Sequence, residues 1–302
     1  MARAKTTRRK AKPGRRQCGA VEVYHRMLER HPGFRERQVE IERFTATSLL
    51  FGQAARSSIT TISVVVNVVY GTRQQNVSDK QIKSQIDALN RDYAASNKDR
   101  SKAPACWSAL VANTNIRFEL ADVTRTKTDE TSFGTDDGVK SVQTGGKAPT
   151  DPDRCLNFWV CNLSGGILGY AQFPGGPPAT DGVVIQWTAF GTVGTATAPF
   201  NVGRTAVHEV GHYFNLHHIW GDTNDCSGTD YVADTPNAQL PNYGRPTFPH
   251  ISCNNGPNGD MFMNYMDYVD DAEMVMFTHG QAARMAAALT GPRNSLIGAV
   301  AP

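Results

Sequence analysis

Four histidines and a glutamate stand within eleven consecutive residues of this chain, and three of the histidines have a spacing that suits metal chemistry. Residues 208–218 read His-Glu-Val-Gly-His-Tyr-Phe-Asn-Leu-His-His. On a helix, His208 and His212 lie one turn apart on the same face, so one nitrogen of each ring can bind the same ion. Glu209 projects beside them, where it can reach a water molecule at the metal without being a ligand itself. The pattern predicts a zinc site.

A third ligand is available in His218, six residues after His212. A catalytic zinc site has three protein ligands and one open position. A straight helix would carry residue 218 past the metal, so the helix must end near Asn215. Asparagine is one of the few residues that readily adopts the left-handed conformation of a helix stop. His217 points away from its neighbour on an extended segment, and we expect it to be structural.

Two other interpretations of the motif stay open. In a thermolysin-like protease, a downstream glutamate takes the place of His218 as third ligand. A zinc-stabilised binding or adhesion module would hold the ion without turnover. Glu209 counts against this last interpretation, since a purely structural zinc site is normally closed by four protein ligands.

The elements that would position these side chains follow from hydrophobic spacing. Residues 59–70 are rich in β-branched side chains, which favours a strand. Ser78 and Gln81 form a capping box at the start of a helix with an apolar face of Ile82, Ile86, Leu89 and Tyr93. Glycine-rich loops separate three further strands, and a closing helix follows, at residues 116–123, 156–160, 183–188 and 280–289. This order predicts an α+β fold with a mixed sheet.

Residues 208–222, HEVGHYFNLHHIWGD, resemble the zinc-binding segment of metzincin metalloproteases, in particular that of the pappalysin family in its ulilysin-like (cytophagalysin) branch. Residues 261–276, MFMNYMDYVDDAEMVM, are similar to the Met-turn region of that family. The resemblance spans roughly residues 60–290, and Asn215 stands where many metzincins have glycine. It implies a metzincin-type catalytic domain: a mixed twisted sheet, a backing helix, an active-site helix and a loop-rich C-terminal subdomain with the Met-turn.

The resemblance also implies roles for three downstream residues. Met266 would be the Met-turn methionine beneath the zinc, which agrees with its plain interpretation as a core methionine. Tyr268 resembles the tyrosine that hydrogen-bonds the developing oxyanion, although on sequence alone it would be only a buried aromatic. Asp271 matches the acid at the base of the S1′ pocket, which favours arginine or lysine just after the scissile bond. An acid in an Asp-Asp pair is otherwise more often solvated.

Residues 229–236, TDYVADTP, resemble a calcium-binding loop of the same branch. The carboxylate of Asp230, the carbonyl of Val232 and the hydroxyl of Thr235 are hard oxygen ligands of the kind that calcium prefers. The alternative is an Asp-rich turn without an ion. The expected cofactors are one catalytic Zn²⁺ and a structural Ca²⁺.

Six cysteines are present, and two of them flank the loop between the zinc motif and the Met-turn region. As in the family, Cys226 and Cys253 are expected to form a disulfide, which would stabilise the fold by roughly 3 kcal/mol and implies an oxidising compartment. The family's second bridge needs a cysteine where this chain has Glu273, so we expect that bridge to be absent. No role is assigned to Cys106, Cys155 and Cys161.

The remaining cysteine, Cys18, lies far ahead of the zinc motif and follows Arg16 and Gln17. A thiolate is a good zinc ligand and could fill the open fourth position. The motif resembles the cysteine switch of pappalysin-type zymogens, and the alternative is a free thiol without a role.

This resemblance divides the chain into a helical pro-segment at residues 17–55 and a metalloprotease catalytic domain at residues 56–302. Residues 31–33, His-Pro-Gly, are expected to break the pro-segment into two helices. An enzyme that prefers a basic residue after the scissile bond could itself cut between Ala55 and Arg56. We therefore expect a mature form that begins at Arg56.

Charge is concentrated at the start of the chain. Residues 1–16 carry eight lysines and arginines and no acid, out of 31 Lys+Arg against 28 Asp+Glu overall. Such a run usually forms a disordered, solvated tail. No basic-aromatic groove follows to support nucleic-acid binding, and no apolar stretch of about 7–15 residues follows to make a secretory signal. The most apolar stretch, residues 63–70, falls far short of the ~20 residues needed to cross a membrane.

Together these features predict a secreted zinc endopeptidase made as a zymogen. Glu209 would act as general base toward the water at the zinc, and the zinc and the Tyr268 hydroxyl would stabilise the tetrahedral oxyanion. An extended substrate is expected to pair with a sheet edge, for which residues 169–172 are the first candidate. The expected partners are protein or peptide substrates, without nucleic acid or membrane, and we expect a monomer.

Overall fold

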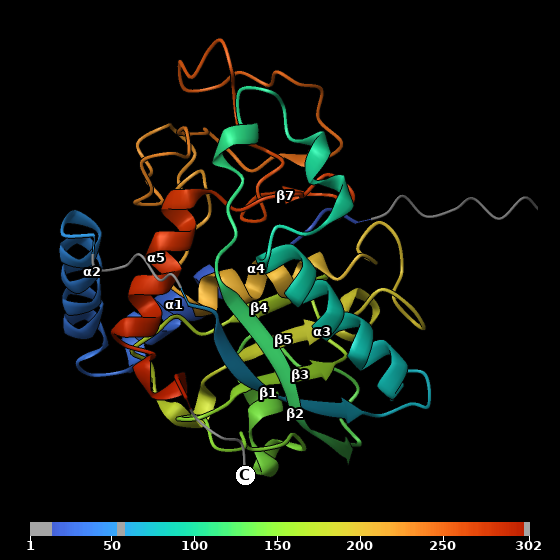
Figure 1. The fold of residues 1–302 in the computed structure, drawn as a ribbon. Coiled ribbons are helices and arrows are strands. Elements are labelled where there is room, and N and C mark those ends of the chain that lie inside the picture. Colours follow the sequence, from blue (N-terminus) through green and yellow to red (C-terminus); the bar gives the residue numbers. More distant parts are fainter. Residues whose placement is uncertain (1–13, 53–57, 299–302) are drawn as a thin grey trace, which may run out of the picture.

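The computed structural model describes residues 14–52 and 58–298. Its main element is a five-stranded sheet in the order β2-β1-β3-β5-β4 (Figure 1). Neighbouring strands run parallel except at β4, which pairs antiparallel with β5 and forms one edge. The predicted mixed sheet is confirmed, and its strands are β1 (Thr60–Tyr70), β2 (Ile116–Lys127), β3 (Leu156–Cys161), β4 (Gly169–Ala171) and β5 (Val183–Gln186).

Two helices pack on one face of this sheet. The first, α3 (Asp79–Tyr93), begins after Ser78, whose side chain accepts a hydrogen bond from the Gln81 amide as predicted. The Gln81 side chain differs from the prediction, because it donates to the carbonyl of Phe190 (2.8 Å) and so ties the helix to a distant loop. The second helix, α4 (Arg204–Tyr213), lies beside α3 and over β4 and β5 (Figure 1).

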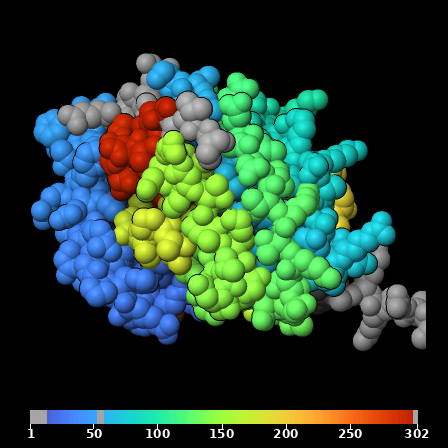
Figure 2. Space-filling view, turned by 90° about the horizontal axis from the view of Figure 1, so that it is seen from below, coloured from blue at the N-terminus to red at the C-terminus, as the bar shows by residue number. Residues whose placement is uncertain are grey.

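The two predicted N-terminal helices are α1 (Ala20–Arg30) and α2 (Phe34–Leu50). Between them Gly33 has a φ of +74°, a left-handed conformation that glycine adopts without strain. Met27 of α1 belongs to the same hydrophobic cluster as Trp159, on the face of the sheet opposite to α4. Figure 2 shows these blue N-terminal residues along one side of the molecule, beside the red C-terminal ones. The pro-segment therefore packs closely on the rest of the protein.

The C-terminal part consists mainly of loops. It contains the parallel pair β6 (Tyr243–Gly244) and β7 (Tyr268–Val269) and the helix α5 (His279–Thr290), which contacts α2. Cys226 and Cys253 form the predicted disulfide, with a Cα–Cα distance of 5.4 Å. Short 3₁₀ helices lie in loops throughout the chain, at Lys98–Lys102, Ser108–Leu110, Gly138–Lys140, Val142–Thr144, Pro178–Thr180, Trp187–Ala189 and Asn294–Leu296.

The N-terminal tail differs from the prediction at its last residue. We expected a solvated tail through residue 16, but Arg16 is only 2% exposed. It is buried because it pairs with Asp271, 255 residues away in the sequence. Most of the tail, residues 1–13, and the expected cleavage point at Ala55-Arg56 lie outside the described residues. Within the described ranges, no helix has the length and apolar character needed to cross a membrane.

Candidate active site

The three histidines of the motif come together at the end of α4. His208 and His212 lie one turn apart on the helix. The helix ends at Tyr213, Phe214 caps it, and Asn215 takes a φ of +70°, the left-handed conformation predicted for it. This turn brings His218 back, so that the three Nε2 atoms lie 3.1–3.2 Å from one another. The structure thus brings all three predicted ligand atoms to one point.

The opposite nitrogen of each ring determines its tautomer. Nδ1 of His208 lies 2.7 Å from the carbonyl of Tyr265, and Nδ1 of His212 lies 2.7 Å from that of Leu216. Nδ1 of His218 lies 2.6 Å from a carboxylate oxygen of Asp222. Because these partners only accept, each Nδ1 carries a proton, and in the neutral ring each Nε2 presents a lone pair. Asp222 is the last residue of the segment 208–222, and no role was predicted for it.

The site fits a zinc ion on the chemistry of its donors. Burial lowers the pKa of His208 and His212 well below the usual value, so both rings are neutral, as zinc ligands must be. Three lone pairs that face one another without a proton between them repel, unless a cation lies among them. Ligands ~2.1 Å from a tetrahedral zinc ion are ~3.4 Å apart, close to the separation of the three Nε2 atoms.

Cys18 reaches the same point from the pro-segment. Its sulfur and the three imidazole nitrogens all lie within 4.8 Å of one another. The thiol also lies 3.3 Å from Glu209 Oε2 and accepts a hydrogen bond from the amide of Ala20. The four side chains predicted as zinc ligands of a latent form are therefore adjacent.

Glu209 lies beside this cluster and is 1% exposed. It comes close to the edge strand, because a Cβ added at Gly169 would lie 2.9 Å from its Cγ atom. Only a glycine at that position leaves the carboxylate room. Burial raises the pKa of Glu209 to about 8, although the Cys18 thiol acts in the opposite direction.

The two predicted residues of the Met-turn region also lie at the site. Met266 is fully buried, and its sulfur packs so closely on Gly211 of α4 that a Cβ there would lie 2.5 Å from it. The ring of Tyr268 lies 4.9 Å from that of His218 and 5.7 Å from that of His208, measured between centroids. Burial raises the pKa of Tyr268, so its hydroxyl is protonated at neutral pH and can donate.

Asp271 is fully buried, and its two carboxylate oxygens have different partners. Oδ2 accepts from the backbone amide of Val202 (2.8 Å), whereas Oδ1 accepts from Arg16 Nη2 of the pro-segment (2.5 Å). The other donors of Arg16 bind Thr205 Oγ1 (3.1 Å) and the carbonyl of Val269 (3.2 Å). The sequence missed this role of Arg16, although its position two residues before Cys18 was a signal.

The pro-segment occupies the edge of the sheet between these two contacts. The amide of Leu168 donates to the carbonyl of Gln17, and the amide of Gly19 donates to the carbonyl of Gly169, both at 2.9 Å. Cys18 pairs with Gly169 in a parallel bridge. The backbone of the pro-segment thus lies on β4, the edge at which a substrate was expected.

A second contact of the pro-segment lies on α2. Glu42 accepts hydrogen bonds from Asn215 Nδ2 (3.0 Å) and Arg284 Nη2 (2.5 Å). His217, the histidine expected to be structural, lies 3.9 Å from the same carboxylate and not among the ligand nitrogens. Burial acts to raise the pKa of Glu42, but His217 and Arg284 lower it to about 2. No sequence signal marked Glu42, because its partners are far away in the chain.

The candidate calcium ligands are neighbours in the structure. The Thr235 hydroxyl lies 2.7 Å from Asp230 Oδ2 and 2.9 Å from the carbonyl of Val232. Burial raises the pKa of Asp230 to about 7. The three oxygens are close together, and calcium binding there stays a prediction.

Comparisons with known proteins agree with this site. Residues 151–290 match the family described as pregnancy-associated plasma protein-A, a group of peptidases. An extracellular metalloprotease of Arthroderma otae is 33% identical over 258 residues, 82% of this chain and 85% of that protein. An extracellular metalloprotease of Pyricularia oryzae is 34% identical over 278 residues, 89% of this chain and 87% of that protein.

Two solved structures extend the comparison to the fold. Mature mirolysin of Tannerella forsythia in complex with a cleaved peptide has 46% identity and a TM-score of 0.79, over 80% of this chain and 97% of that one. A promirolysin mutant of the same organism has 42% identity and a TM-score of 0.86, over 93% of this chain and 97% of that one. The added coverage shows that the likeness to the proenzyme extends over more of this chain.

Proposed function

This chain belongs to the pappalysin family of metalloendopeptidases, and we propose that it is a secreted zinc endopeptidase made as a zymogen. The observation that carries the proposal is the convergence of three imidazole Nε2 atoms, 3.1–3.2 Å apart, beside the buried Glu209. His208, His212 and His218 would hold the ion. The relatives of this chain from Arthroderma otae and Pyricularia oryzae are named extracellular metalloproteases. This supports secretion, and the disulfide agrees with it.

The protein's own groups perform the proton transfers of peptide hydrolysis in this proposal. When bound, zinc supplies a Lewis acid that lowers the pKa of a water molecule toward ~7 and polarises the substrate carbonyl. The Glu209 carboxylate accepts the proton of the attacking water and passes it to the nitrogen of the leaving amine. The Tyr268 hydroxyl donates a hydrogen bond to the carbonyl oxygen as negative charge develops there.

Replacing Glu209 by glutamine tests this mechanism. We expect one zinc per chain to remain and kcat to fall by a factor of about 10²–10⁴, because the amide cannot accept a proton. Metal content and the digestion of a denatured protein mixture, read by mass spectrometry, are the measurements. Retention of both zinc and full peptidase activity would contradict the mechanism.

Asp271 is proposed as the S1′ residue that selects arginine or lysine after the scissile bond. The contact of Arg16 supports this, because a guanidinium from the pro-segment already lies on Asp271 Oδ1 at 2.5 Å. The ring of Phe200, 5.0 Å below the guanidinium carbon, adds a favourable cation–π contact. A substrate arginine would find the same partners after the pro-segment has left.

Latency is proposed to come from Cys18 as a fourth zinc ligand, which closes the position needed for water. The direction of the pro-segment backbone supports a second reason why the enzyme does not cleave this segment in the cleft. It pairs parallel with β4, whereas we propose that a substrate pairs antiparallel. The peptide bonds of the pro-segment are then presented in reverse order to the catalytic groups.

Activation is proposed to remove the pro-segment of residues 17–55 together with the basic tail before it, and to leave a catalytic domain of residues 56–302. Mature mirolysin matches 80% of this chain and promirolysin 93%, a difference that suits the loss of an N-terminal segment. We also propose that the enzyme itself cuts between Ala55 and Arg56. N-terminal sequencing of the activated protein should find Arg56 first, and a start elsewhere would reject this cleavage site.

The competing interpretations have less support. A thermolysin-like site would use a glutamate in place of His218, but the Nε2 of His218 lies within 3.2 Å of the other two. A binding module without turnover disagrees with relatives that are named metalloproteases. A structural calcium ion at Asp230, Val232 and Thr235, and a monomeric state, remain part of the proposal.

A further inference from the structure

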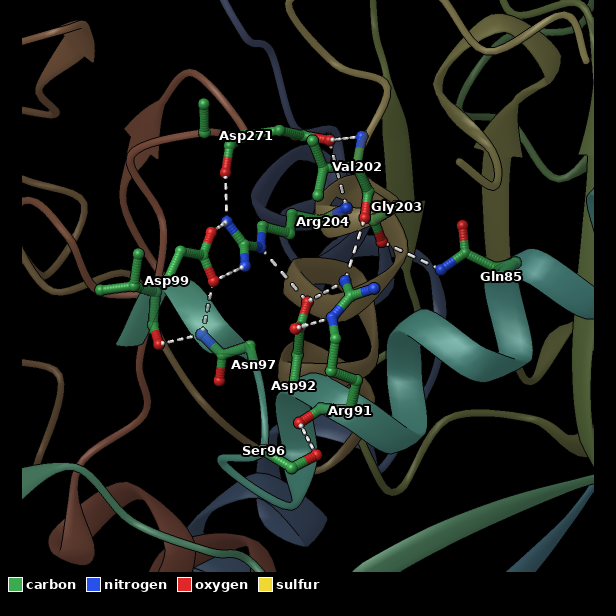
Figure 3. A network of polar contacts seen from close by, with 12 residues as sticks. Gln85, Arg91, Asp92, Ser96, Asn97, Asp99, Val202, Gly203, Arg204 and Asp271 are labelled. Atoms are coloured by element: carbon green, nitrogen blue, oxygen red, sulfur yellow. Dashed lines mark hydrogen bonds and ion pairs between the residues drawn. The ribbon is translucent and has the colours of Figure 1, made fainter. Parts of the chain in front are cut away.

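A buried polar network joins the start of α4 to the loop that carries Asp271 (Figure 3). Its centre is Arg204, the first residue of α4, which is 1% exposed. The guanidinium binds both carboxylate oxygens of Asp99, at 2.7 and 2.8 Å, and lies 3.2 Å from Asp92 Oδ2. Its Nη1 also donates to the backbone carbonyl of Asp271 at 2.7 Å.

Arg204 contacts Asp271 a second time through its backbone. The amides of Val202 (2.8 Å) and Arg204 (3.3 Å) both donate to Asp271 Oδ2. One oxygen of the carboxylate is therefore held by the start of α4, and Oδ1 is left to face the cation that occupies the pocket. The carbonyl contact and the amide contacts together fix both the position and the rotation of the Asp271 side chain.

The other side of the network rests on α3 and the loop after it. Arg91 donates to the carbonyl of Val202 (3.3 Å), and Gln85 donates to that of Gly203 (2.9 Å), as Figure 3 shows. Asn97 donates to Asp99 Oδ1 (2.9 Å) and to the carbonyl of Val275 (3.0 Å). Burial acts to raise the pKa of Asp99, but the hydrogen bond and charge of Arg204 lower it, so the pair is ionised.

We propose that Arg204 is the positioning residue of the S1′ pocket, which sets the geometry of Asp271 and so the selection of a basic side chain after the scissile bond. This inference rests on the proposed role of Asp271. The planar guanidinium suits the task because it binds one carboxylate with two nitrogens and still reaches a carbonyl. A lysine keeps the charge but cannot make the same set of contacts from one point.

The test compares two peptides that differ only in arginine or leucine after the scissile bond. In the activated Arg204→Lys enzyme, we expect the arginine-to-leucine ratio of kcat/KM to fall by about tenfold to a hundredfold, because a displaced carboxylate binds the cation poorly. The loss should appear mainly in KM for the arginine peptide, while kcat for the leucine peptide changes little. An unchanged ratio overturns the proposal.

Arg293→Lys is the matched control, because Arg293, which follows α5 in the chain, contacts the other end of α4. Arg293 is also a buried arginine: it binds both oxygens of Asp181, at 2.6 and 3.0 Å, and donates to the carbonyl of Tyr213. It has no contact with Asp271 in the described structure, so this variant should lose stability without changing the ratio. An equal fall of the ratio in both variants would mean that general loosening, and not positioning, is responsible.

Two further variants separate this inference from the proposed function. Asp271→Asn should abolish the arginine preference, and if it does not, the S1′ assignment itself fails. Where Asp271→Asn abolishes the preference but Arg204→Lys keeps the wild-type ratio, only the positioning role is overturned. If Arg204→Lys does not fold, Asp99→Asn decides instead, because it weakens the anchor of Arg204 and should lower the ratio, and an unchanged ratio again overturns the proposal.

Discussion

The residues of the candidate zinc site that are hardest to predict from the sequence are the hydrogen-bond partners of its imidazole rings. Two of them are backbone carbonyls, of Tyr265 and Leu216, which no side-chain motif can reveal. The third is Asp222, whose carboxylate lies 2.6 Å from His218 Nδ1. Such a partner fixes the orientation of the ring and makes the opposite nitrogen a better ligand.

Asp222→Ala should therefore weaken zinc binding without removing a ligand. We expect the zinc dissociation constant to rise by about 10- to 100-fold. Competition with a chelator of known affinity measures it. Asp225→Ala is the control, since Asp225 lies in the same loop and bonds to Ser227 and Thr223, with no histidine ring among its described contacts. Equal loss in both variants would contradict a specific role for Asp222.

At the scale of elements, α2 contacts the rest of the protein at several points. Arg37 and Gln38 donate to the carbonyls of Gly175 and Pro174, and the Glu42 carboxylate forms the charged contact. Glu42 binds Asn215, the left-handed residue in the turn after α4, and Arg284 on α5. The contact therefore joins the pro-segment to the same turn that places His218. A variant at Glu42 therefore tests the docking of α2 without changing any candidate zinc ligand.

Glu42→Gln should loosen α2 in a pH-dependent way. The pKa of Glu42 is lowered from 4.5 to about 2 in the folded protein. A lowered pKa means that the carboxylate stabilises the fold above pH ~4.5, and that this contribution is lost as the pH falls toward ~2. The difference in free energy of unfolding between wild type and Glu42→Gln should shrink over that window. Denaturant unfolding measures it.

Glu40→Gln is the control for this prediction, because Glu40 is exposed on the same helix. It should behave like the wild type at every pH. A constant difference between wild type and Glu42→Gln from pH 5 to pH 2 would mean that the ion pair does not account for the docking.

Most elements could be predicted because their signals are local. The β-branched run of β1, the apolar spacing of α3 and the stop at Asn215 each depend on neighbouring residues. The capping role of Gln81 and the solvated state of Arg16 were predicted wrongly for the opposite reason. Their partners, Phe190 and Asp271, are more than a hundred residues away, and a tertiary contact took precedence over the local pattern.

At the scale of the whole molecule, the site could be predicted as a set of residues but not as a set of contacts. The zinc motif has fixed spacing on one helix, so His208, Glu209 and His212 follow from periodicity. The network of Arg204 joins α3, α4 and the Asp271 loop, and no spacing rule connects those three segments. The disulfide was expected from the family and is present.

The proenzyme should keep its zinc longer than the activated enzyme. Cys18 adds a fourth donor within 4.8 Å of the three histidine nitrogens. We expect zinc loss to a chelator to be about tenfold slower in the wild-type proenzyme than in a Cys18→Ala proenzyme. Time-resolved metal release measures the difference. Identical rates in the two proteins would argue against Cys18 as a ligand.

The pro-segment contacts the rest of the protein at Asp271, at β4 and at Arg284, among other points. These three belong to widely separated parts of the chain. Cleavage of the peptide bond between the pro-segment and the catalytic domain would remove none of these contacts. In the proposed zymogen, the cleaved pro-segment would therefore stay bound to the catalytic domain as a non-covalent inhibitor while both are concentrated. Activity would then appear on dilution or after degradation of the cleaved segment, whereas a concentrated solution would stay inactive.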